Sequence, residues 1–156
     1  MKWKRQDMQQ YLKSKEYIDT AIVPLLPFSM EGNDEDLLSL TYQHEVMDVF
    51  TERLEKEYKG RIFRFPTYSY LATSKIEDEV ERLNGYYEQL KTQPFQFVFY
   101  LTFDAKWKKH EKNLEGQLLW LPILKDGDIH QEETKKVILD QNEQITDLIR
   151  AYWSET

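Results

Sequence analysis

The chain has 156 residues, and 28 Asp and Glu against 21 Lys and Arg give it a formal net charge of −7. It contains no cysteine, which excludes a disulfide framework, a Cys-ligated zinc site, an iron–sulfur cluster and a thiol nucleophile. A chain of this length with 40% hydrophobic residues can bury a core without a metal or a disulfide.

The chain carries no signal-peptide pattern and no apolar run that approaches the length of a bilayer span, so we expect a cytoplasmic protein without membrane insertion. Strand and helix patterns alternate along the whole length without a linker or a repeat. We therefore expect one domain over residues 1–156.

The first half of the chain predicts two helices and two strands. A short amphipathic helix occupies residues 4–15, and the continuous apolar run of residues 18–27 is typical of a strand covered on both faces. Pro24 and Pro27 indicate that this strand frays at its end, because proline donates no ladder hydrogen bond. Apolar positions then recur every three or four residues over 33–58, which predicts a long helix, and residues 61–65 form a short second strand.

The second half continues the alternation. Ser74 and Glu77 form a capping-box pattern that predicts the start of a third helix. Residues 95–103 are dense in aromatic and β-branched side chains, so we expect a central strand with neighbours on both sides. One or two helical turns follow over 106–114, then a fourth strand over 117–121. A last helix is capped by Asp128, with Gln131 at the capping-box position.

This order predicts an α/β fold, a three-layer sandwich with a mostly parallel four-stranded sheet and helices on both faces. The strands at 18–27, 61–65 and 95–103 are expected to be mutually parallel. The orientation of the fourth strand stays open, because the connection before it only just supplies the dozen residues that a parallel crossover needs.

No diagnostic catalytic motif is present. The chain lacks the glycine-rich fingerprints that bind nucleotides, and its three histidines stand alone, with only His44 and Asp48 at metal-binding helical spacing. Ser29 and Ser69 follow strands but lack the flanking glycines of a nucleophile elbow. We therefore expect no cofactor, no metal and no assigned catalytic residue.

Charge is distributed unevenly. Residues 1–15 carry five basic residues against one acid, whereas residues 16–58 carry eleven acids against two basic residues. Four lysines surround Trp107, but three nearby acids nearly balance them, which indicates a solvated helix. The overall acidity argues against nucleic acid as a partner.

If three strands are parallel, their carboxyl ends bring several polar side chains to one edge of the sheet, where open α/β sheets place ligands. Asp104 could act there as a base or orient a hydroxyl, or it could instead cap the short helix that follows it, which the pattern favours. The candidate ligand-binding residues are Ser29, Glu31, Asn33, Tyr68, Tyr70 and Asp104.

Several segments resemble a known family. The opening Met-Lys-Trp, KEYIDTAIVPL at residues 15–25, FRFPTY at 63–68 and WLP at 120–122 resemble the YpiF-like family of small uncharacterised proteins from low-GC Gram-positive bacteria. Members of that family are sometimes encoded near genes for menaquinol–cytochrome c reductase, so the resemblance implies a link to respiratory-complex biogenesis. It implies no catalytic residue.

Two functions remain. The favoured one is a non-catalytic interaction or adaptor domain whose partner is another protein, and the alternative is a small-molecule-binding or enzymatic domain with a pocket at the carboxyl edge of the sheet. A polar, concave pocket at that edge would favour the alternative, and an exposed apolar patch would favour the adaptor. The sequence does not predict an oligomeric state.

Overall fold

A fully parallel β-sheet forms the centre of the molecule. The computed structural model describes residues 1–155, and in it β1 (Thr20–Phe28) pairs on one side with β4 (Phe97–Thr102), which pairs in turn with β5 (Gln117–Trp120). On its other side β1 pairs with two short strands in succession, β2 (Ile62–Arg64) and β3 (Tyr68–Leu71). The remaining elements are the helices α1 (Arg5–Lys13), α2 (Asp34–Glu57), α3 (Ile76–Leu90) and α4 (Glu132–Ser154), and the 3-10 segments η1 (Lys15–Tyr17) and η2 (Ala105–Asn113).

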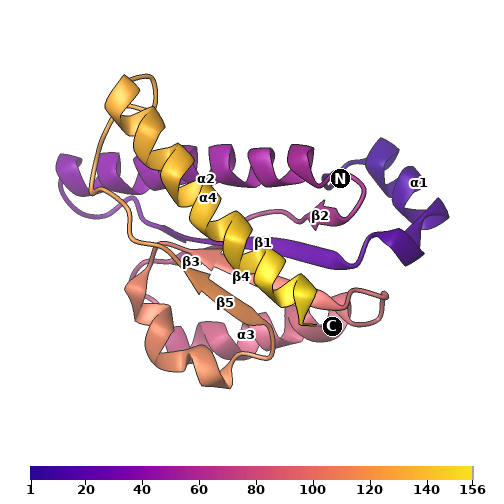
Figure 1. Cartoon of the computed structure of the whole chain (residues 1–156). Coiled ribbons are helices and arrows are strands. Elements are labelled where there is room, and N and C mark those ends of the chain that lie inside the picture. The colour runs from indigo at the N-terminus through magenta and orange to yellow at the C-terminus, as the bar shows by residue number, and fades with distance from the viewer. Residues whose placement is uncertain (156) are drawn as a thin grey trace.

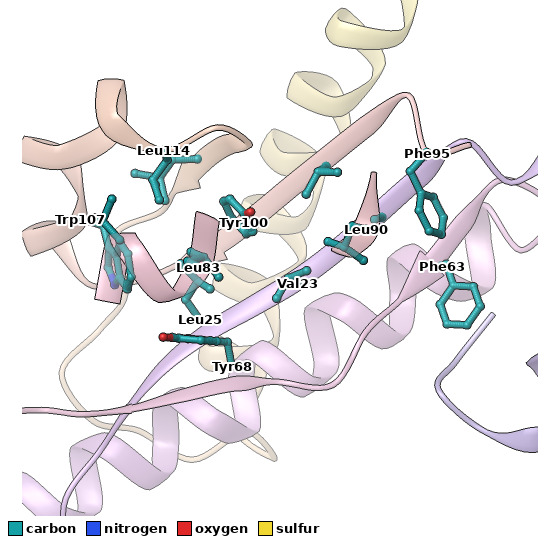
Figure 2. Close-up of a cluster of buried hydrophobic side chains, with 14 of the residues drawn as sticks. Val23, Leu25, Phe63, Tyr68, Leu83, Leu90, Phe95, Tyr100, Trp107 and Leu114 are labelled. Atoms are coloured by element: carbon teal, nitrogen blue, oxygen red, sulfur yellow. The ribbon is translucent and has the colours of Figure 1, made fainter. Parts of the chain in front are cut away.

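Helices cover both faces of this sheet. Figure 1 shows α2 and α3 on opposite sides of the strands, with α4 crossing on the side of α2. The core has two corresponding parts. One joins the sheet to α2 and α4 through residues such as Phe50, Phe99 and Ile145, and the other joins it to α1, α3 and η2. In Figure 2 the second part extends from Trp107 and Leu114 at one end to Phe63 and Phe95 at the other.

The predicted fold class is confirmed, as are the parallel arrangement of the first three strands and the central place of β4. The open orientation of the last strand is resolved, since β5 is parallel to β4. The strand count differs, because residues 68–71, where the sequence predicted no strand, form β3.

The extra strand has a physical cause in the prolines. The amide of Phe65 donates to the carbonyl of Ile22, and that of Ala72 donates to the carbonyl of Phe28. The backbone N–H and C=O groups of the even-numbered residues in β1 therefore point toward β2 and β3. Pro24 has no N–H group, so it donates no hydrogen bond to this edge. The edge strand breaks opposite Pro24, between Arg64 and Tyr68, and then resumes. The expectation of a frayed end was wrong, because β1 continues through Pro24 as far as Phe28.

Two helix starts also differ from expectation. The third helix has no side-chain cap, because the Ser74 hydroxyl donates to the Glu79 carboxylate at 2.7 Å instead of capping. The last helix begins at Glu132, and Asp128 accepts from the amide of His130 in the turn that precedes it. The Ser74 hydroxyl is thus satisfied by a side-chain carboxylate, and Asp128 is satisfied by a local turn.

Candidate functional site

One group of predicted site residues meets at the carboxyl edge of the sheet. The Tyr70 hydroxyl donates to Oδ2 of Asp104 at 2.7 Å and accepts from Nε1 of Trp107 at 2.9 Å. The other oxygen of Asp104 accepts from the amide of Lys106 at 3.0 Å, so Asp104 also caps η2. Burial, followed by the hydrogen bond to Asp104, raises the pKa of Tyr70 above its ordinary value. The phenol therefore remains protonated and serves as a donor.

A second group surrounds Glu79. Its carboxylate accepts from the Tyr68 hydroxyl at 2.7 Å, from the Ser74 hydroxyl, and from the Arg82 guanidinium. Burial alone would raise the pKa of Glu79, but these three donors outweigh it and hold the pKa below its ordinary value. Burial and the bond to Glu79 likewise raise the pKa of Tyr68. Glu79 thus remains a buried carboxylate that ties β3 to α3.

The aromatic side chains of both groups are buried. Tyr68 and Tyr70 lie with their rings 6.3 Å apart in the buried core between the sheet and α3, where Figure 2 shows Tyr68 beside Leu25 and Leu83. Trp107 is fully buried, and its bond to Tyr70 extends from the end of β4 across the end of β1 to β3. The indole therefore occupies the α3 side of the carboxyl edge and leaves Tyr70 no free hydrogen-bonding position for a ligand there.

The loop after β1 carries the other three candidates. The Ser29 hydroxyl accepts from the amide of Glu31 at 3.0 Å, and the Asn33 side chain accepts from the amide of Asp36 at 2.8 Å, which caps α2. The Glu31 side chain is exposed. Ser29 borders the groove described next, on the α2 side of the sheet, whereas Tyr68 and Tyr70 lie on the α3 side. The structure therefore brings Tyr70 and Asp104 together and places the loop residues apart from them.

An open apolar groove lies between this loop and the first turns of α2. It encloses about 810 Å³ and is lined by Pro27, Phe28, Ser29, Met30, Asp34, Leu37, Leu38, Leu40, Thr41 and His44. The exposed fractions of Phe28, Met30 and Leu38 are 50%, 74% and 58%. Leu71, which pairs in register with Phe28, is 59% exposed. We call this surface the apolar groove.

The chain segment that borders the apolar groove, residues 29–36, is acidic, and we call it the acidic rim. Among residues 1–155 the carboxylates of Glu31, Asp34 and Asp36 have no ion-pair partner, and Asp34 lines the groove. Burial lowers the pKa of His44, so this side chain brings no positive charge to the groove at neutral pH. The groove therefore combines apolar walls with negative potential.

The sequence offered two signals for this groove, one of which its helical pattern concealed. Leu37 and Leu38 both fit the three-four rhythm of α2, but adjacent residues lie about 100° apart on a helix, so one of such a pair can face away from the core. Leu37 is partly buried and Leu38 is exposed. A methionine in a short polar loop, Met30, was the second signal.

Within the described part of the chain, no group of three or more His, Cys, Asp or Glu side chains could hold a metal ion. None of the described helices combines the length and the apolar character needed to cross a membrane.

Comparison with known proteins gave two relatives and a family match. Residues 9–153 match the model of a family described as a protein of unknown function, DUF2487. The chain is 26% identical over 154 residues to the uncharacterized protein YpiF of Bacillus subtilis (strain 168), covering 99% of each chain. It is 26% identical over 138 residues to ribonuclease R of Thermotoga maritima, which covers 85% of this chain but 18% of the ribonuclease. No solved structure gave a significant match.

Proposed function

Since the chain belongs to the DUF2487 family, whose description names no activity, we propose a function from its own surface: it is a non-catalytic adaptor that binds an apolar segment of another protein in the apolar groove. The observation that carries the proposal is the cluster of large apolar side chains, Phe28, Met30 and Leu38, each at least half exposed along one groove. Exposed apolar clusters of this kind mark interaction sites.

The polar candidate residues also support a non-catalytic role, because their side chains are engaged within the protein. Each of the two central polar side chains, Asp104 and Glu79, spends its carboxylate on hydrogen bonds within the protein. Catalysis at the carboxyl edge would need such groups to face a bound substrate. Their partners include the buried Tyr68 and Tyr70, which supports a structural role for both carboxylates.

The unpaired acids on the rim define the chemistry of the partner. A segment that brings Lys or Arg beside its apolar side chains would meet Glu31, Asp34 and Asp36, and such rim charges accelerate and orient association. RNA, the molecule that the name of the ribonuclease relative suggests, would meet repulsion here. The link to respiratory-complex biogenesis rests on the family resemblance alone.

The test is a selection of short random peptides displayed on phage against the full chain, followed by affinity measurement on the selected peptides. We expect enriched peptides with apolar side chains flanked by Lys or Arg. Leu38→Gln should lower the affinity for these peptides by about tenfold or more, because burying a leucine contributes roughly 1.5–3 kcal/mol.

Leu12→Gln is the matched control. Leu12 lies on α1 and is 57% exposed, against 58% for Leu38, so the two changes remove equal apolar surface from helices at different places. Equal weakening by both variants, or selection of no consensus, would refute the proposal.

A small molecule is the competing occupant of the same groove, since about 810 Å³ lies within the roughly 300–1,000 Å³ of ligand pockets. A metabolite that raises the melting temperature of the wild-type protein but not of Leu38→Gln, together with failure of the peptide selection, would favour that alternative.

A further inference from the structure

The outer edge of the sheet, beyond β2 and β3, is paired over only part of its length. The amides of Phe65 and Ala72 point toward β1, and the backbone groups of alternate residues point the opposite way. The outward N–H and C=O groups are therefore those of Ile62 and Arg64 in β2 and of Ser69 and Leu71 in β3. The two halves of this edge differ in what meets those outward groups.

The β2 half is covered by the start of the chain. The Met1 ammonium donates to the carbonyl of Ile62 at 2.9 Å, and the amide of Arg64 donates to the carbonyl of Met1 at 2.8 Å. Lys2 forms a parallel bridge with Arg64. Residues 1 and 2 therefore lie along β2 as a short added strand would, and the chain then turns away into α1.

The β3 half is open. Of its outward groups, only the carbonyl of Leu71 has a backbone partner, the amide of Ser74 at 2.9 Å. In the described residues the outward amide and carbonyl of Ser69 and the amide of Leu71 have no partner. Edge strands are usually protected by charged side chains, but Tyr68–Leu71 contains none.

The open half lies beside the apolar groove. Tyr68 and Tyr70 point to the α3 side, so the alternate side chains of Ser69 and Leu71 point to the α2 side, where the groove lies. Leu71 is paired with Phe28, a wall of that groove. A strand placed along β3 would direct every second side chain toward the same apolar surface.

We propose that the partner segment binds by strand addition: an extended peptide pairs with β3 at Ser69 and Leu71, directs alternate apolar side chains into the apolar groove and places Lys or Arg at its acidic rim. The inference rests on the proposed function and specifies the conformation of the partner. Strand addition draws affinity from main-chain hydrogen bonds and specificity from alternate side chains. A second copy of this chain is a poorer occupant, because each copy carries a net charge of −7 and its own acidic rim.

The first test is a series of backbone N-methylated versions of the tightest peptide obtained in the selection. Methylation removes one amide donor and keeps every side chain. We expect an alternating pattern, in which methylation at positions facing β3 weakens binding by about tenfold and methylation at the positions between them changes it little.

The second test changes the protein edge. Ser69→Pro removes the outward amide of Ser69, whereas Ser69→Ala removes the hydroxyl and keeps the amide. We expect Ser69→Pro to weaken the peptide by about tenfold or more and Ser69→Ala to bind normally. If Ser69→Pro does not fold, the N-methylation series alone decides the question.

The outcomes separate the two proposals. Weakening by Leu38→Gln without an alternating N-methylation pattern would overturn strand addition and leave the groove as the binding site. If peptide binding is unchanged in Leu38→Gln, both the proposed function and strand addition are refuted. A dimer in sedimentation of the wild-type chain that Ser69→Pro converts to monomer would overturn the partner assignment in favour of a second copy.

Discussion

Replacing Asp104 distinguishes a structural carboxylate from a ligand-binding one. Its oxygens accept from the amide of Lys106 and from the Tyr70 hydroxyl. Losing a helix cap costs about 1 kcal/mol, and losing a hydrogen bond to a charged group costs roughly 1.5–3 kcal/mol. Since Asp104 is partly exposed, we take the lower part of that range and expect Asp104→Ala to lower the unfolding free energy by about 3 kcal/mol. A chain of this size loses about 2–4 °C in melting temperature per kcal/mol, which gives a decrease of about 6–12 °C.

The measurement is urea and thermal unfolding, with Tyr70→Phe as the companion variant. Tyr70→Phe keeps the cap but deprives Asp104 of its donor and leaves the buried indole N–H of Trp107 without an acceptor, so it should cost about 1–3 kcal/mol. The double variant should be less destabilised than the sum of the two, by about 1 kcal/mol, because both changes remove the same bond. An Asp104→Ala protein that melts like the wild type, yet loses stabilisation by a metabolite, would refute this account.

Four further changes test other parts of the structure. The pKa of Glu79 is lower in the native state than in the unfolded chain, so its contribution to the free energy of unfolding is complete at neutral pH and is lost as the pH falls below about 5. Glu79→Gln should be less stable than the wild type at pH 7. Its free energy of unfolding in urea should then fall less steeply toward pH 3. Gly116→Ala would place a Cβ 2.5 Å from the buried Tyr100 ring and should cost about 1–3 kcal/mol in thermal melts. Gly85→Ala, in α3 with open space around it, should stabilise the protein by about 0.5–1 kcal/mol. Asp34→Asn should slow association of the selected peptide, and stopped-flow measurements should show a weaker dependence on salt than in the wild type.

The sequence predicted the fold where one pattern dominates and missed it where two patterns compete. Residues 97–101 are hydrophobic without interruption, and all of β4 is buried, because it has a neighbour on each side and a helical layer on each face. Residues 68–71 alternate between buried and exposed, as a strand with one covered face does. Pro66 just before them favoured a loop, and only the tertiary pairing with β1 reveals that the strand resumes.

The candidate site was harder to predict, because residue type alone does not reveal where a hydrogen bond goes. Parallel strands do bring Tyr70 and Asp104 together, as the topology requires. Their partner Trp107, however, comes from a 3-10 segment that the lysine-rich sequence suggested was solvated. The apolar groove depends on where the first turns of α2 lie relative to the end of β1. Figure 1 shows these turns with the β1–α2 loop at the left extremity of the molecule, an arrangement that local periodicity does not encode.

The position of Trp107 bears on which part of the carboxyl edge can bind a partner: the α3 side, where Tyr70 and Asp104 lie, or the α2 side, where the apolar groove lies. An open α/β sheet normally leaves a crevice where the strands lead to opposite sides, here between β1 and β4. The indole, bonded to Tyr70 and fully buried, links η2 to β3 on the α3 side of this edge, so a substrate that engaged Tyr70 and Asp104 would require η2 to move and the Asp104 cap to break. The β3 edge requires no such change, because the outward amides of Ser69 and Leu71 and the apolar groove are already accessible. A surface that binds without rearrangement incurs a smaller conformational penalty on association, and this favours the edge as the binding site.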